Sequence, residues 1–331
     1  MFYDSFGDGS VQCRLCPWGC TLTNGARGRC RVRENRGGKL YSLVWGKPVA
    51  IHKDPIEKKP FYHFMPGSVA FSFATVGCNL SCLYCQNWEI SQSKPEEVPF
   101  YDAPPVVLIS KVLREKTPVV AYTYSEPIVF YEYVYDCSTV ARKNKLRNVM
   151  ISAGFINPEP LKKLLTVLDA VKIDLKAFNQ DFYTDIVRGK LDPVLETLIT
   201  IKNSGKWLEI VNLIVPGRND SPGEIKRLSK WIMSNLGPEV PVHFTRFTPM
   251  YKMVNVPPTP VKTLEVCRKI AMAEGIKYAY VGNVPGHPGN NTYCPKCKKL
   301  LIVREAFDAN ISGLKNSTCK YCGTQIAGVW K

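Results

Sequence analysis

Short apolar runs alternate with amphipathic stretches through the middle of this 331-residue chain, and that alternation limits the folds it can adopt. Seven runs have the composition of buried strands: 69–75 (VAFSFAT), 119–124 (VVAYTY), 148–153 (NVMISA), 170–175 (AVKIDL), 208–215 (LEIVNLIV), 242–247 (VHFTRF) and 278–282 (YAYVG). Between them, apolar residues recur at helical spacing, as at Leu161, Leu164, Leu165 and Leu168. Strand and helix alternating six times predict an α/β fold with a parallel sheet, a partial (β/α)6 TIM-type barrel.

A loop with three cysteines follows the first predicted strand directly. Cys78, Cys82 and Cys85 are spaced C-x3-C-x2-C, and only Val76 and Gly77 separate them from the strand. Sites of barrel enzymes lie at the carboxyl ends of the strands, so we expect this loop at the mouth of the barrel. Three thiolates on a [4Fe-4S] cluster leave one iron without a protein ligand. The missing fourth cysteine therefore indicates an open position for a substrate or cofactor.

This motif after a first barrel strand resembles the signature of the radical S-adenosylmethionine (SAM) superfamily. The resemblance implies a [4Fe-4S] cluster on Cys78, Cys82 and Cys85 whose open iron binds SAM. It also implies reductive cleavage of SAM to a 5′-deoxyadenosyl radical that abstracts hydrogen from the substrate. The sequence indicates no catalytic residue beyond the cluster ligands.

Two further segments resemble SAM-binding elements of this superfamily. Ser125 and Glu126 precede Pro127 in a segment similar to Gly-Gly-Glu-Pro, which receives the methionyl amino group, although the two glycines are not kept. Asp174 and Lys176 resemble the Asp-x-Lys element of glycyl-radical activating enzymes, and by that match they contact the polar end of SAM. The structural alternatives are a turn cap at Glu126 and a rim ion pair between Asp174 and Lys176.

Two single residues complete the predicted set of SAM contacts. Tyr84 falls where the superfamily places a ring against adenine, and Asn212 lies in EIVNLIVPGRND, which resembles the fifth strand of the activating enzymes. Outside the barrel, CRLCPWGCTLTNGARGRCRVR, KPFYHFMPGS and YVGNVPGHPGNNTYCPKC resemble the radical SAM enzymes of the AmmeMemoRadiSam system, relatives of pyruvate formate-lyase activating enzyme. That resemblance covers nearly the whole chain but does not identify the substrate.

Two pairs of cysteines near the carboxyl end have the spacing of a closed metal site. Cys294 and Cys297 form the first pair, and Cys319 and Cys322 form the second. The spacing predicts a four-thiolate zinc ribbon, with rubredoxin-type iron as the alternative. A structural metal folds a tail that is too small to hold itself together otherwise.

A second set of four, Cys13, Cys16, Cys20 and Cys30, is spaced C-x2-C-x3-C-x9-C near the amino end. The spacing indicates a metal site without deciding the metal. The neighbouring arginines favour Zn²⁺ in a basic structural module. A second [4Fe-4S] cluster is the alternative, as an electron relay or an auxiliary substrate site.

The net charge of +16 is concentrated outside the predicted barrel. We divide the chain into a metal-binding module with its lead-in (1–66), the barrel (67–285) and the ribbon (286–331). The first part holds 11 Lys and Arg against 5 Asp and Glu, and the last holds 7 against 2. Basic flanks favour a macromolecular substrate, with protein slightly ahead of RNA and a small metabolite third. The chemistry also requires a low-potential electron donor such as ferredoxin or flavodoxin.

Cysteine usage and hydropathy indicate a cytoplasmic protein. The chain holds 13 cysteines, an odd number, and only Cys137 and Cys267 fall outside the three sets, so we expect metal sites rather than a disulfide scaffold. No signal-type start and no run of roughly 18 to 20 apolar residues is present. The rival function is a non-catalytic zinc-ribbon nucleic-acid binder or an electron-carrier iron-sulfur protein. A cluster that only carries electrons normally has four protein ligands.

Overall fold

An eight-stranded sheet forms the centre of the computed structural model, which describes residues 1–331. Seven strands run parallel: β7 (Val69–Ala74), β8 (Val119–Tyr122), β9 (Arg147–Ser152), β10 (Ala170–Asp174), β11 (Trp207–Ile214), β12 (Val242–Arg246) and β13 (Ala279–Gly282). They coincide with the seven predicted runs. The sheet order is β13-β12-β11-β10-β9-β8-β7-β6, and its two edges do not pair, so the barrel stays open.

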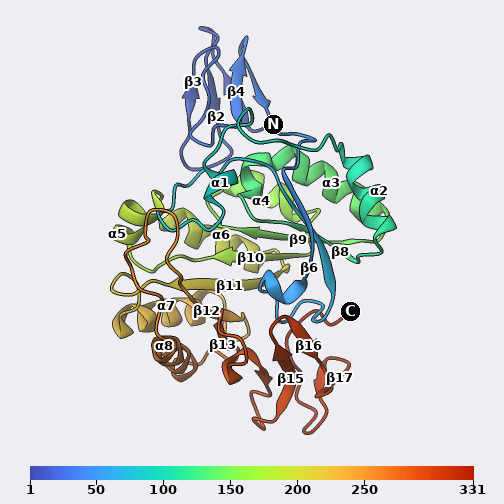
Figure 1. Cartoon of the computed structure of the whole chain (residues 1–331), viewed down its shortest axis with the longest axis vertical. Helices are drawn as coiled ribbons and strands as arrows, with labels where there is room; N and C mark the ends of the chain where they lie inside the picture. The colour runs from blue at the N-terminus through green and yellow to red at the C-terminus, as the bar shows by residue number, and fades with distance from the viewer.

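Six helices connect the parallel strands and pack against the sheet (Figure 1). They are α2 (Pro105–Arg114), α3 (Tyr131–Lys143), α4 (Pro158–Leu165), α6 (Asp192–Asn203), α7 (Pro222–Asn235) and α8 (Val261–Ala273). Four of them carry proline in the first turn, where the missing N–H has no helical partner and the fixed φ suits the helix. The six strand–helix units confirm the predicted partial (β/α)6 barrel.

The amino end of the barrel is filled by the segment that leads into it. Ile56, Phe61 and Phe64 pack with small strand residues such as Ala70 and Ala170, which leave room for the larger side chains. The strand β6 (Ala50–Pro55) precedes this plug and pairs antiparallel with β7. Sequence reasoning missed β6, because His-Lys-Asp at its centre lacks the apolar character of the other strands. The domain limits stay predictions, but β6 belongs to the central sheet.

The cysteine-rich segments at the two ends of the chain lie at opposite ends of the molecule (Figure 1). The amino-terminal one contains β1 (Tyr3–Ser5), β2 (Val11–Cys13), β3 (Thr21–Leu22), β4 (Arg33–Arg36) and β5 (Lys39–Ser42). The carboxyl-terminal ribbon contains β14 (Thr292–Tyr293), β15 (Leu300–Glu305), β16 (Asp308–Asn310), β17 (Leu314–Lys315) and β18 (Thr318–Cys319). Their strands pair antiparallel, which suits knuckles that bring cysteines together.

Short helices complete the secondary structure: η1 (Ile56–Lys58), α1 (Trp88–Ser91), η2 (Pro127–Phe130), α5 (Gln180–Phe182), η3 (Tyr183–Val187) and η4 (Pro288–Asn290). Cys137 and Cys267 are buried in α3 and α8, as expected of core residues. None of the helices has both the length and the apolar character that crossing a membrane requires.

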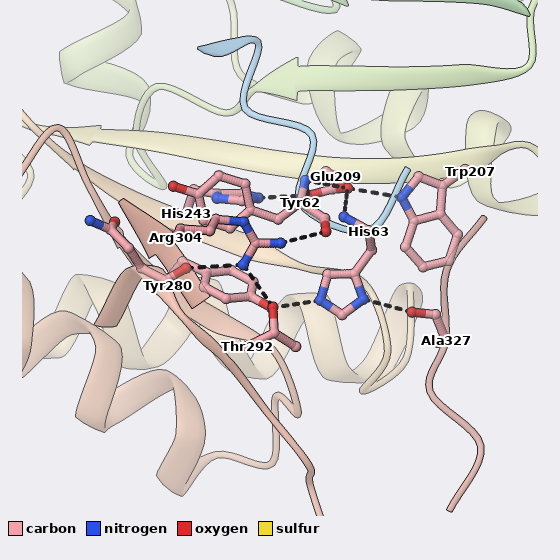
Figure 2. A network of polar contacts seen from close by, with 10 residues as sticks. Tyr62, His63, Trp207, Glu209, His243, Tyr280, Thr292, Arg304 and Ala327 are labelled. Carbon is pink, nitrogen blue, oxygen red and sulfur yellow. Dashed lines mark hydrogen bonds and ion pairs between the residues drawn. The ribbon is translucent and has the colours of Figure 1, made fainter. Parts of the chain in front are cut away.

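A buried chain of hydrogen bonds ties the ribbon to the amino end of the barrel (Figure 2). The Arg304 guanidinium donates to Thr292 Oγ1 (2.8 Å), which bonds to the Tyr280 hydroxyl (2.9 Å). The Tyr280 hydroxyl bonds in turn to His63 Nε2, and His63 Nδ1 lies 2.6 Å from the Ala327 carbonyl oxygen. The Ala327 carbonyl only accepts, so Nδ1 of His63 carries a proton. Burial lowers the pKa of His63 to about 4, so at neutral pH the ring is neutral and Nε2 accepts from the Tyr280 hydroxyl.

The same network surrounds one fully buried carboxylate, Glu209 (Figure 2). It accepts hydrogen bonds from the backbone N–H groups of Tyr62 (3.0 Å) and His63 (2.8 Å). It also accepts them from Trp207 Nε1 (3.0 Å) and His243 Nε2 (2.7 Å). A buried charge with four donors is satisfied and holds the strands and the lead-in in one arrangement. Because these residues lie near the starts of their strands, the network stabilises the fold at the end opposite the expected site.

We predict that the protein loses stability as the pH falls from about 6.5 to about 4. Burial lowers the pKa of His63 from 6.5 to about 4, so only the unfolded chain binds a proton in this range. The contribution of neutral His63 is complete above pH 6.5 and is lost towards pH 4, by up to about 3 kcal/mol. Urea unfolding between pH 7 and pH 5 measures it, and His63→Gln should show a shallower fall. Equal slopes for the two proteins would contradict the assignment.

Candidate active site

The predicted site residues gather where the parallel strands end. The loop 76–87, which we call the cluster loop, follows β7, and Ser125 and Glu126 follow β8. Asp174 ends β10, and Asn212 lies towards the end of β11. The Asn212 side-chain amide donates to the Leu175 carbonyl at 2.7 Å, which joins the ends of β10 and β11. The sheet thus brings segments from four strands to one edge.

The cluster loop is held from beneath by a π-helix, η3 (Tyr183–Val187). The backbone N–H of Ser81 donates to the Val187 carbonyl (3.2 Å), and that of Leu83 donates to the Ile186 carbonyl (2.9 Å). π-Helical turns are rare and occur frequently at functional sites. Sequence reasoning missed this element, since a single π turn has no periodic signal.

The three thiols of the cluster loop stand apart from one another. Cys82 is buried, Cys78 and Cys85 are partly exposed, and no three of the loop's sulfurs lie within 4.8 Å of one another. The Leu80 N–H donates to Cys78 Sγ (3.4 Å), and hydrogen bonds to sulfur are usual around iron-sulfur clusters. Burial raises the pKa of Cys82 to about 11, so the thiolate needs a cation to hold it. The set fits a cluster in which each thiolate binds a different iron.

Asp174 lies between two lysines rather than in a single ion pair. Lys176 Nζ is 3.5 Å from one carboxylate oxygen, and Lys172 Nζ bonds to the other. Burial opposes ionisation, but the two lysines together hold the pKa of Asp174 below its usual range. Lys172 was missed by sequence reasoning, although alternation along β10 places residues 172, 174 and 176 on one face.

Glu126 is buried and already has three donors. It accepts hydrogen bonds from the Ser152 hydroxyl (2.6 Å) and from the N–H groups of Ala153 (2.8 Å) and Ile128 (3.2 Å). Burial raises the pKa of Glu126, while these donors favour the ionised form. The carboxylate caps the short helix η2, which is the structural role that the sequence analysis gave as the alternative. It also lies near Cys78 and Lys176.

Tyr124 stands in place of a glycine of the Gly-Gly-Glu-Pro segment and still adopts a backbone conformation typical of glycine. Its φ of 64° is left-handed, a conformation that glycine adopts freely and that costs other residues roughly 1–2 kcal/mol. The Tyr124 carbonyl accepts a hydrogen bond from the Asn87 side chain (2.7 Å), which belongs to the cluster loop. The Ser125 hydroxyl donates to the Thr75 carbonyl (2.7 Å) and so joins the ends of β7 and β8.

Two of the predicted SAM contacts carry buried polar atoms without a protein partner. They are the Tyr84 hydroxyl and the Asn212 side-chain oxygen, in residues that are 5% and 1% exposed. Buried polar atoms are nearly always paired, because leaving one unpaired costs about 1–3 kcal/mol. The Lys176 charge lies near the Tyr84 hydroxyl. These residues fit a polar ligand bound between the cluster loop and the ends of β10 and β11.

The four carboxyl-terminal cysteines converge much more tightly. All four sulfurs lie within 4.8 Å of one another, with Cys294 and Cys322 at 3.6 Å and Cys297 and Cys319 at 3.7 Å. Four sulfurs around one ion at about 2.3 Å stand about 3.8 Å apart. This site therefore has the dimensions of a single tetrahedral ion.

Comparisons with known proteins agree with this geometry. Residues 73–232 match the family model of the radical SAM superfamily. The chain belongs to this superfamily. It is 47% identical over 328 residues to an uncharacterised protein of Methanocaldococcus jannaschii, covering 98% of each chain. It is 28% identical over 163 residues to the pyruvate formate-lyase 1-activating enzyme of Escherichia coli K12, covering 47% of this chain and 65% of that enzyme.

The fold is also that of a solved radical SAM structure. A radical SAM methyltransferase from Sphaerobacter thermophilus superposes with a TM-score of 0.52 and 15% identity, over 66% of this chain and 67% of that one. The family match and the activating-enzyme relative make the chain an enzyme that cleaves SAM by radical chemistry. This excludes the non-catalytic alternative drawn from the sequence.

Proposed function

We propose that this radical SAM enzyme binds a [4Fe-4S] cluster on Cys78, Cys82 and Cys85 and SAM at the open iron. The observation that carries the proposal is the presence, at the same edge of the sheet, of the three cysteines and of unpartnered buried polar atoms on Tyr84 and Asn212. When bound, the cluster and SAM supply a 5′-deoxyadenosyl radical, formed as one electron breaks a carbon–sulfur bond of SAM, and the radical takes a hydrogen atom from the substrate.

The residues around the cluster loop orient SAM and exclude water. Lys176 offers a point charge to the SAM carboxylate, and Asp174, held by Lys172, faces the amino group. Glu126, held by its three donors, lies near Cys78. The Tyr84 ring supports adenine while its hydroxyl takes a hydrogen bond from the cofactor. A dry, packed surrounding protects the radical from side reactions.

The proposed substrate is a macromolecule, and we place protein ahead of RNA. The two basic modules at the ends of the barrel support a macromolecular partner. The Escherichia coli relative, of which this chain covers 65%, is named for activating another enzyme, pyruvate formate-lyase. A low-potential donor such as ferredoxin or flavodoxin supplies the electron. All 13 cysteines are free, which supports a reducing cytoplasm.

We assign zinc to Cys294, Cys297, Cys319 and Cys322. The tight sulfur spacing supports one tetrahedral ion, and zinc is the usual occupant of closed four-thiolate sites between β hairpins. The ion stabilises the ribbon, whose strands are only two to six residues long.

We predict that Cys82→Ala abolishes the formation of 5′-deoxyadenosine. Removing one of three cluster ligands should lose the reduced cluster's EPR signal together with SAM cleavage. Cys137→Ala is the matched control, because Cys137 is buried in α3 away from the cluster loop. Anaerobic assays with dithionite measure both proteins, and cleavage by Cys82→Ala at the wild-type rate would refute the assignment.

We predict that Tyr84→Phe weakens SAM binding about five-fold without lowering the stability of the protein. The substitution removes only a hydroxyl that has no protein partner, so a loss of about 1 kcal/mol in binding reports a hydrogen bond to SAM. Tyr278→Phe is the control, since Tyr278 also carries an unpartnered buried hydroxyl but lies with the ribbon cluster. Titration calorimetry compares them. Unchanged affinity in Tyr84→Phe would remove the hydroxyl from the site.

We predict that extract from the source cells stimulates 5′-deoxyadenosine formation and that protease treatment abolishes the stimulation. A protein substrate reacts with the radical and so allows further cycles of SAM cleavage. Treatment of the extract with ribonuclease should leave the rate unchanged. Loss with ribonuclease alone would assign RNA, and survival through both treatments would assign a metabolite. The product is measured by chromatography of anaerobic reactions.

A further inference from the structure

The amino-terminal cysteines surround a cavity. Cys13 ends β2, Cys16 and Cys20 lie in the turn before β3, and Cys30 lies shortly before β4. We call these four the N-terminal thiols. All four line the same enclosed cavity in the amino-terminal module. They therefore form one site and not two separate pairs.

The spacing of the N-terminal thiols differs from that of the ribbon. In the ribbon all four sulfurs lie within 4.8 Å of one another, but no three of the N-terminal sulfurs do. Thiolates that share one ion stand about 3.8 Å apart. Thiolates of a cubane each bind a different iron and leave the space between them to the cluster. A wider set around a cavity fits the second arrangement better than the first.

The walls of this cavity suit a buried anionic cluster. Trp18 and Val129 contribute apolar surface, and the Arg29 guanidinium stacks over Trp18 at 3.9 Å from the ring centroid. Arg33, only 2% exposed, lines the cavity and has an Nε–H without a partner. Its other nitrogens bond to Glu132. A donor left free beside sulfur atoms is the kind of group that hydrogen-bonds an iron-sulfur cluster.

The cavity also adjoins the cluster loop. Asn79, between Cys78 and Cys82, lines it, and the Trp18 Nε1 donates to the Asn79 carbonyl (2.7 Å). Gly77 has a φ of 100°, and a Cβ there would come within 2.9 Å of the Cys30 carbonyl oxygen. The N-terminal thiols therefore belong to a module packed against the loop that holds the radical-site cysteines.

From these observations we propose that Cys13, Cys16, Cys20 and Cys30 bind a second [4Fe-4S] cluster rather than the zinc ion that the sequence favoured. All four irons have a protein ligand, so this cluster has no open position for SAM. The enzyme then holds two kinds of metal site at its two ends: a second cluster beside the catalytic loop and a single ion in the ribbon.

The test uses the full-length triple variant Cys78→Ala, Cys82→Ala, Cys85→Ala, reconstituted anaerobically with iron, sulfide and competing zinc. We expect about eight iron and eight sulfide ions in the wild type and about four of each in the triple variant, with about one zinc in both. Reduced triple variant should give an EPR signal that SAM does not alter. Because the radical site is absent, this result is independent of the proposed function.

Further substitutions in the triple variant locate the remaining iron. Adding Cys13→Ala should remove it and leave the zinc, whereas adding Cys137→Ala should change neither. A triple variant with two zinc ions and no iron would overturn the proposal, as would one zinc and no other metal. The triple variant keeps all four N-terminal thiols, so either of these two metal contents would count against the proposal and could not be attributed to a substitution in the amino-terminal module.

Discussion

All strands of the parallel part of the sheet run in the same direction, and the position of the site depends on this common direction. Seven strands that run the same way end at a single edge, so segments separated by more than a hundred residues meet there without long loops. The cluster loop after β7 and the amide of Asn212 in β11 lie at the same edge of the sheet for this reason. The opposite edge holds the buried hydrogen-bond network around Glu209 and His63.

That network explains how a small ribbon becomes a fixed part of the enzyme. The hydrogen-bond chain from Arg304 to Ala327 begins and ends in the carboxyl-terminal part but passes through Tyr280 of β13 and His63 of the lead-in. Glu209 binds the lead-in to β11 and β12 from the other side. Segments from both ends of the chain are thereby held at the amino end of the barrel.

Much of this arrangement was predictable from the sequence, for physical reasons. Buried parallel strands read as apolar runs, and cysteine spacing identifies metal sites, so the barrel and the ribbon were recovered. The strand β6 was not, because an antiparallel edge strand tolerates His52 and Lys53. Lys172 was overlooked because its role depends on sharing a face with Asp174. The left-handed Tyr124 and the π-helix η3 have no signal in a single sequence, since tertiary contacts impose them.

The N-terminal thiols show that cysteine spacing in a sequence does not determine which metal group is bound. Loops of suitable length can fold around one ion or around a larger group, and only the distances between the sulfur atoms separate the two. Within this chain the ribbon provides the internal standard, because its sulfurs converge and those of the other module do not.

The buried network around Glu209 and His63 is separated from the proposed iron sites. Both proposed clusters bind to cysteines of the amino-terminal module and of the cluster loop that packs against it. The carboxyl-terminal ribbon and the network that ties it to the barrel lie at the far end of the molecule (Figure 1). The hydrogen bonds that hold the ribbon to the barrel therefore involve none of the residues that bind the proposed clusters.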